Sequence, residues 1–149
     1  MTLRRSESLD HLHRGPQYGK TFLRSSRGFP LLTNGSYPVI DESSGGSLAG
    51  MIAAVEELLR LANAETVVVP GHGAIGNRAA LLCFHNMLST IEGRIKPLIA
   101  SHSTAAEILA ATPTADFDLV WGQGYVTGDI FVRMVLAGFG LRETAKALS

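Results

Sequence analysis

The sequence has almost no cysteine and no long apolar run. Cys83 is the single cysteine among 149 residues, so neither an intrachain disulfide nor a cysteine-rich zinc site can form. Its position between Leu82 and Phe84 predicts a buried thiol. No stretch approaches the roughly 18 uninterrupted apolar residues of a membrane-spanning helix. The best candidate, residues 51–59, is interrupted by two glutamates.

A net charge is also missing, because 13 basic side chains balance 13 acidic ones. This balance argues against non-specific binding to nucleic acid or to a membrane surface, and we expect neither as a partner. Arg4 and Arg5 form a twin-arginine pair, but no apolar segment follows them, so no export signal is expected. The expectation is a soluble chain, cytoplasmic by default.

The charges are distributed unevenly along the chain. Residues 1–28 carry six basic and two acidic side chains, whereas the remainder carries seven basic and eleven acidic ones. The first segment also lacks a helical or strand period, which predicts an irregular basic N-terminal tail. Hydrophobic residues make up 46% of the sequence, so residues 29–149 are expected to form one folded domain.

Helical periodicity dominates this domain. Ser47 is expected to cap a helix over residues 48–62. Asn77 is expected to cap a longer helix, which Pro97 ends or kinks near its last turn. Apolar residues at steps of three and four predict the buried face of this second helix: Leu81, Phe84, Leu88, Ile91, Ile95 and Leu98.

The last third of the domain predicts two shorter helices separated by a loop. Thr104 and Glu107 have the spacing of a capping box. Residues 112–126 combine proline, aspartates and glycines, which favours a structured loop. Thr127 is expected to cap a final helix. The buried residues predicted for that helix are Ile130, Met134, Val135 and Gly138.

One confident strand interrupts the helices. Residues 66–69 are a β-branched run without polar alternation, which predicts a strand covered on both faces and ended by Pro70. A single strand cannot satisfy its own backbone hydrogen bonds. Either residues 20–40 supply partner strands, or the sheet belongs to a segment that this sequence does not contain.

The sharpest candidate for chemistry is His72, which follows this strand in the loop Pro70-Gly71-His72-Gly73. Flanking glycines allow a tight turn and close approach of a metal or substrate, so His72 is a candidate metal or catalytic residue. The alternative is a histidine that only hydrogen-bonds within its loop. The other histidines fit structural roles: His85 on a helix surface, His102 at a helix end, and His11 and His13 in the tail.

Acidic residues give weaker signals. The loop over residues 41–47 leads into a helix start, where free amides can hold an anion or simply accept a helix cap. Asp116, Asp118 and Asp129 are too dispersed for a carboxylate pair, and we expect them at loop and first-turn positions. Neither a phosphate-binding loop nor a nucleophile elbow occurs.

Four sequence motifs carry a resemblance to a known family. The order NGSYPVID (34–41), SSGGS (43–47), VVVPGHG (67–73) and PTADFD (113–118) resembles the C-terminal half of metallo-β-lactamase-fold hydrolases over about residues 31–140. The resemblance implies an α/β (α+β) class and one helix-rich half of a four-layer αββα sandwich. It also implies that His72 is a ligand of a dinuclear zinc site, whose bound hydroxide attacks an ester, amide, thioester or lactone carbonyl.

The other ligands of that family have no counterpart here. Its His-x-His-x-Asp-His signature should stand well upstream, and residues 28–32 (GFPLL) occupy the place of its metal-bridging aspartate. His11 and His13 mimic the start of the signature, but Arg14-Gly15-Pro16 follows them. One histidine alone does not make a zinc site. We therefore assign no catalytic residue, expect no tight zinc binding by this chain alone, and predict that it is inactive in isolation.

A half sandwich exposes an apolar sheet surface and a strand edge, so it calls for a partner. The expected partner is a complementing N-terminal half or a second copy of the chain, with a small-molecule substrate only for the completed enzyme. Three explanations follow: a truncated gene product with a divergent start, half of an enzyme completed in trans, or a remnant that has become a binding module. The alternative to a hydrolase fragment is thus a non-enzymatic α/β interaction module or homodimer.

Overall fold

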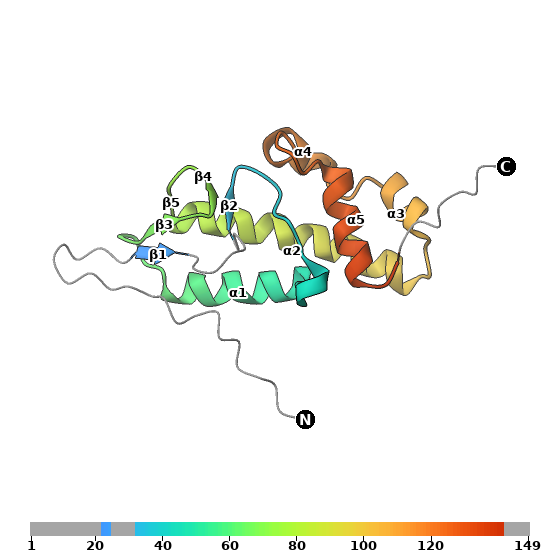
Figure 1. Cartoon of the computed structure of the whole chain (residues 1–149), viewed down its shortest axis with the longest axis horizontal. Helices are drawn as coiled ribbons and strands as arrows, with labels where there is room; N and C mark the ends of the chain where they lie inside the picture. Colours follow the sequence, from blue (N-terminus) through green and yellow to red (C-terminus); the bar gives the residue numbers. More distant parts are fainter. Residues whose placement is uncertain (1–21, 25–31, 142–149) are drawn as a thin grey trace, which may run out of the picture.

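The computed structural model describes residues 22–24 and 32–141, which form helices and two small sheets of a general α+β class. α1 (Leu48–Leu61) and α2 (Arg78–Ala100) run side by side along the long axis, with the strands at one end of the pair (Figure 1). The other elements are β1 (Phe22–Arg24), β2 (Thr33–Asn34), η2 (Glu42–Ser44), β3 (Val67–Val69), β4 (His72–Gly73), β5 (Gly76–Asn77), α3 (Ala105–Ala110), α4 (Ala115–Trp121) and α5 (Gly128–Gly138). None of the described helices is long and apolar enough to cross a membrane.

The two long helices begin at the predicted caps. The Ser47 hydroxyl accepts a hydrogen bond from the Gly50 amide, and the Asn77 side chain accepts one from the Ala80 amide. α2 buries the predicted stripe from Leu81 to Ile95, whereas Leu98 is only partly buried. Pro97 lies in the last turn of α2, which ends at Ala100, so the helix ends near the proline as predicted.

Cys83 contradicts the prediction of a buried thiol. It is exposed, although Phe84 beside it is buried. Successive residues of an α-helix are rotated by about 100°, and the core contacts of Phe84 turn Cys83 towards solvent. Apolar sequence neighbours on a helix therefore did not indicate burial.

The strands form two small sheets. β3 lies between β1, to which it runs parallel, and β5, to which it runs antiparallel. Residues 20–40 therefore supply partner strands, as one of the two sequence hypotheses required. β1 also lies within the segment predicted to be irregular, whose remaining residues, including His11 and His13, fall outside the described part. A second sheet pairs β2 with β4 in parallel.

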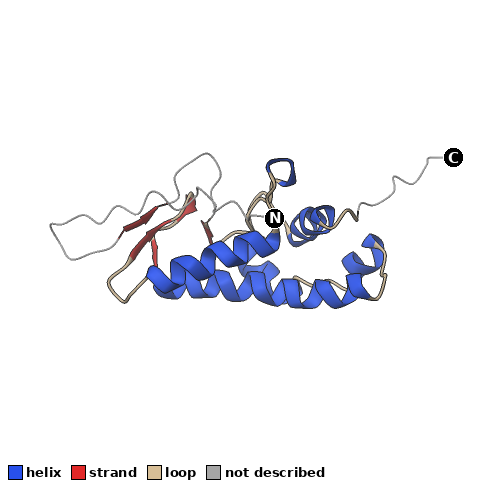
Figure 2. Cartoon of the chain, turned by 90° about the horizontal axis from the view of Figure 1, so that it is seen from below, coloured by secondary structure: helices blue, strands red, loops and turns tan. Residues whose placement is uncertain are grey.

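Only one face of β3 is fully covered. Val68 is 4% exposed, whereas Val67 and Val69 on the opposite face are partly exposed. The strand was predicted to be covered on both faces, and the structure corrects this. In the described part, the helices lie on one side of the sheet, as Figure 2 shows. The valines that face away from the helices therefore remain partly accessible.

The C-terminal region confirms two caps and corrects one element. Thr104 and Glu107 form the predicted capping box at α3, and Thr127 caps α5. Residues 115–121 form α4, although a loop was predicted over residues 112–126. The acidic first turn of α4 favours its N-terminus, and burial of Trp121 holds its last turn against the core.

The buried face of α5 also differs from the prediction. Val135 is buried as expected, but Ile130 is 38% exposed, Met134 is only partly buried and Gly138 is exposed. The face that packs against the core consists instead of Gly128, Phe131, Val132, Val135 and Leu136. Phe131 sets this rotation, because its ring stacks on Tyr37 with centroids 5.0 Å apart and an interplanar angle of 7°.

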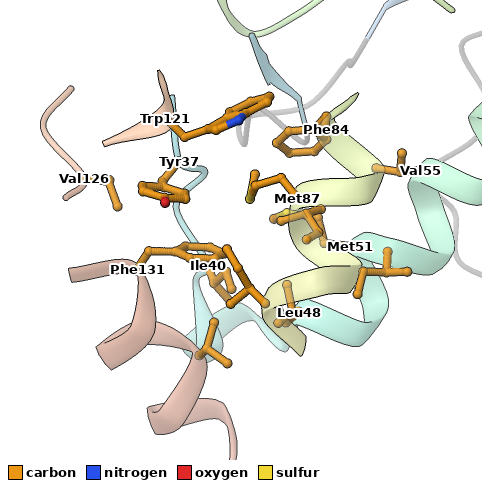
Figure 3. Packing of buried hydrophobic residues seen from close by; sticks show 14 of the residues in the cluster. Tyr37, Ile40, Leu48, Met51, Val55, Phe84, Met87, Trp121, Val126 and Phe131 are labelled. Atoms are coloured by element: carbon orange, nitrogen blue, oxygen red, sulfur yellow. The ribbon is translucent and has the colours of Figure 1, made fainter. Parts of the chain in front are cut away.

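One hydrophobic core joins both ends of the molecule. Figure 3 shows Tyr37 and Phe131 beside Ile40, with side chains of α1 and α2 packed next to them. The Phe84 ring of α2 contacts Trp121 of α4 at a centroid distance of 5.8 Å. The segment that follows β2 therefore lies between the long helices and the C-terminal helices.

Candidate functional site

His72 lies at the end of the sheet region, two residues beyond Pro70, where β3 has ended. Its side chain is exposed, and its backbone pairs in parallel with Thr33 of β2. The sequence hypothesis required an accessible ring at a strand end. A ring packed inside the protein would have excluded a ligand role, and the structure does not have that arrangement.

The loop that carries His72 is fixed to β2 by several hydrogen bonds. The Gly71 amide donates to the Leu32 carbonyl at 3.0 Å, and Nδ2 of Asn34 donates to the Ala74 carbonyl at 2.8 Å. Gly73 has φ +93°, a left-handed conformation that side chains rarely adopt. A Cβ atom there would also collide with the backbone of Asn34. Glycine is thus required, and the imidazole is presented from a constrained backbone.

The described residues do not gather a set of metal donors around His72. Within residues 22–24 and 32–141 there is no group of three or more His, Cys, Asp or Glu side chains that could hold a metal ion. His85 lies elsewhere, with Nε2 at 3.2 Å from Glu56 Oε1 and 3.4 Å from Ser89 Oγ. It joins α2 to α1, which agrees with a structural role. His102 is exposed beyond the end of α2, at φ +60°.

A small hollow lies beside the His72 loop. Asn34, Pro70 and Gly76 contribute to its wall, together with Phe84 of α2. The rest of its lining is also largely apolar and consists of Leu32, Thr33, Val68, Ala80 and Leu81. The immediate surroundings of the histidine therefore offer apolar contacts and an amide, rather than further charged donors.

The loop over residues 41–47 uses its polar groups internally. The Asp41 carboxylate accepts hydrogen bonds from the Ser43 amide at 3.0 Å and from the hydroxyls of Ser43 and Ser44 at 2.6 and 2.7 Å. These hydroxyls hold the pKa of Asp41 below its ordinary value, because they stabilise the charged form. Of the two sequence alternatives, capping accounts for the observed bonds.

A polar network inside the core was not predicted. The Tyr37 hydroxyl donates to Asp118 Oδ1 at 2.8 Å and lies 3.3 Å from the Thr114 carbonyl oxygen. Burial raises the pKa of Tyr37 well above its ordinary value, and the hydrogen bond to Asp118 and its negative charge add to the effect. Asp118 was expected in a loop, and no local pattern indicates a partner 81 residues away.

Arg94 makes a second unpredicted connection. Its guanidinium donates to the Pro113 carbonyl at 2.8 Å and to the Asp116 carboxylate at 2.5 Å, and it lies over the Phe117 ring at 5.6 Å. These contacts attach the start of α4 to α2. Both networks hold the C-terminal helices in place.

In comparisons with known proteins, neither a family model nor a curated protein nor a solved structure matches this chain.

Proposed function

We propose that this chain is the C-terminal portion of a metallo-β-lactamase-like, metal-dependent hydrolase, in which His72 is one ligand of a zinc site completed by an N-terminal half. The proposal rests on the sequence order of the motifs from residue 34 to residue 118. The observation that carries it is the exposed imidazole of His72, held at a strand end by a loop that requires glycine at position 73.

The donor set explains why the chain alone is inactive in this proposal. Catalytic zinc takes three protein ligands and a water molecule, and the described residues contain no group of three His, Cys, Asp or Glu side chains that could provide them. Zinc therefore does not fit this half alone, and no reaction step follows from the described residues. The role of the chain is to position one ligand and to supply one wall of the site.

The sheet supports a need for a second half. Val67 and Val69 are partly exposed on the face of β3 that the described helices leave open. Apolar sheet faces are normally covered by a second layer. A layer seated there would lie beside the end of β3, after which His72 follows, so the same partner can cover the valines and bring the missing ligands.

Co-expression with a chain that supplies the N-terminal half, including the His-x-His-x-Asp-His signature, tests the proposal. We expect a stable complex that retains zinc and cleaves a generic ester such as 4-nitrophenyl butyrate. His72→Ala should abolish activity and remove zinc, whereas His102→Ala, an exposed histidine elsewhere, should leave both unchanged. A complex whose zinc content and rate are insensitive to His72→Ala would refute the ligand role.

Two glycine variants test the positioning of the ring. Gly73→Ala forces a Cβ against the Asn34 backbone, whereas Gly45→Ala has the same left-handed strain at φ +81° but open space around it. We expect Gly73→Ala to lower zinc retention in the complex and Gly45→Ala to affect stability alone. Equal zinc retention in the two variants would show that the geometry of the loop is irrelevant to the metal.

The second candidate is a non-enzymatic α/β interaction module, including a homodimer. The observation in its favour is the same open face of β3, which a second copy of the chain can cover. Size-exclusion chromatography with light scattering distinguishes the two. A concentration-independent dimer that Val67→Lys dissociates, and that does not exchange for the N-terminal half, favours the module; a monomer that binds the N-terminal half favours the hydrolase.

A further inference from the structure

The loop that carries His72 contributes no side chain to the core. Residues 71–75 are all exposed, and the residues on either side of them, Pro70 and Gly76, are partly buried. A segment without buried side chains opens easily unless hydrogen bonds to its neighbours hold it. The contacts of this loop with β2 therefore decide how firmly His72 is held.

β2 belongs to a segment that is itself firmly packed. Leu32 and Thr33 are buried before Asn34, and Tyr37 is buried after it. The Thr33 hydroxyl also donates to the Ser36 carbonyl at 2.6 Å, which closes the turn between β2 and Tyr37. Asn34, which is partly buried, thus extends its side chain from a segment that is fixed to the core on both sides.

Two hydrogen bonds connect this segment with the loop, one on each side of His72. Before the histidine, the Gly71 amide donates to the Leu32 carbonyl at 3.0 Å. After it, Nδ2 of Asn34 donates to the Ala74 carbonyl at 2.8 Å. The first bond joins backbone atoms, which most residues at these positions would supply. The second depends on the identity of one side chain.

Two glycines allow the close approach of Asn34 to the loop. A Cβ atom at Gly73 would collide with the Asn34 carbonyl oxygen, and a Cβ atom at Gly76 would lie 3.3 Å from Nδ2 of the same residue. Gly73 is also paired with Asn34 in the contact of β2 with β4, which lie beside each other in Figure 1. Both the backbone and the side chain of Asn34 thus meet the loop where a larger residue would not fit.

We propose that Asn34 is a positioning residue for His72, because its side-chain amide holds the far side of the loop that presents the imidazole. The inference rests on the proposed function, in which His72 is a zinc ligand. A ligand that is already held in place loses less conformational freedom when the metal binds, so the affinity for the metal is higher. Asn34 needs no contact with the metal for this effect.

Order in the loop of the complete chain, without zinc, tests the inference. Asn34→Leu and Asn34→Asp roughly keep the size of the side chain, but neither donates to a carbonyl near pH 7, where the aspartate is ionised. The measurement is the NMR order parameter of the backbone amides of residues 72–74. We expect about 0.85 in the wild type and a fall towards about 0.6 in both variants.

Two controls separate positioning from a general loss of stability. The amide of Ile91, buried in the middle of α2, should keep its order parameter in all variants. Asn63 uses Oδ1 to accept hydrogen bonds from the Glu65 amide and the Thr66 hydroxyl, so Asn63→Asp keeps an acceptor and should leave residues 72–74 unchanged. Wild-type order at residues 72–74 in both Asn34 variants, or an equal loss of order at Ile91, would overturn the inference.

Zinc affinity of the complex with the N-terminal half, measured by competition with a chelator, tests the consequence for the metal. Asn34→Leu should raise the zinc dissociation constant about tenfold, as removal of supporting residues around metal ligands commonly does. An unchanged constant in Asn34→Leu, with zinc lost in His72→Ala, would overturn the positioning role alone. Zinc retained by His72→Ala would instead overturn the proposed function, while the order parameters of the free chain still report whether Asn34 holds the loop.

Discussion

The hydroxyl of Tyr37 donates a 2.8 Å hydrogen bond to Oδ1 of Asp118, which lies 81 residues further along the chain. The Tyr37 amide also donates to the carbonyl of Trp121, three residues beyond this aspartate. Together these bonds fasten the segment after β2 to α4. Because β2 also pairs with the loop of His72, the same segment aligns the histidine with the C-terminal helices.

Tyr37→Phe should lower the free energy of unfolding by about 1–3 kcal/mol, because it leaves a partly buried carboxylate with one hydrogen bond fewer. Among the described residues, the Asp118 carboxylate would keep the long contact of its Oδ2 with Thr114 Oγ1, at 3.4 Å. Urea denaturation followed by circular dichroism measures the change. Tyr125→Phe, at a 92% exposed position, is the control and should stay within about 0.5 kcal/mol. Equal stability of the two variants would contradict the role of the network.

The same tyrosine predicts a dependence of stability on alkaline pH. Folding raises the pKa of Tyr37 above its ordinary value of 10.0, chiefly through burial and then through Asp118. The folded state therefore holds the proton more tightly. The resulting stability is complete below pH 10 and is lost as the pH rises above it. Urea midpoints of unfolding, measured from about pH 8 to about pH 11, should show that the difference in stability between the wild type and Tyr37→Phe becomes smaller as the pH rises. A difference that stays constant over this range would refute the predicted pH dependence.

Gly128→Ala should destabilise the protein by about 1–3 kcal/mol through overpacking. A Cβ at this position would collide with Asp118 Oδ1 and Thr114 Oγ1, so the carboxylate would have to move away from Tyr37. Gly93→Ala is the matched control, because Gly93 is exposed within α2 and has open space around it. It should stabilise the protein by about 0.5–1 kcal/mol. Thermal denaturation of both variants measures whether their changes in stability have opposite signs. A Gly128→Ala variant that is more stable than the wild type would disprove the clash.

Cys83 should react with a thiol reagent such as 5,5′-dithiobis(2-nitrobenzoate) in the native protein, because it is exposed on α2. We expect one equivalent of released thiolate without denaturant. Cys83→Ser should change the free energy of unfolding by less than about 0.5 kcal/mol, since no core contact is lost. If Cys83 reacted only after urea had been added, the thiol would be buried in the native protein, as the sequence predicted.

The local helix signals could be read from the sequence because their partners are close along the chain. The caps at Ser47, Asn77 and Thr127 each accept a hydrogen bond from an amide three residues later. The apolar stripe of α2 likewise depends on spacing alone. The seven residues of α4 gave no such signal, because a stripe needs more turns than so short a helix provides.

The candidate site was predictable only in part. His72 stood out through its flanking glycines, and it does lie exposed at a strand end. The hydrogen bond that holds its loop comes from Asn34, 40 residues away in the sequence from its acceptor. The network of Tyr37 and Asp118 is equally distant. Neither connection follows from spacing, because each depends on which surfaces the helices bring together.

By itself, the sequence determined where the long helices begin, which face of α2 is buried, and where a histidine follows a β-branched strand. These properties depend on hydrogen bonds and apolar spacing within a few residues. Only the tertiary structure decided that β1 pairs with β3, that Cys83 faces solvent, and that α5 turns Phe131 onto Tyr37. Those outcomes depend on packing between segments distant in sequence, where burial of one side chain fixes the orientation of its neighbours.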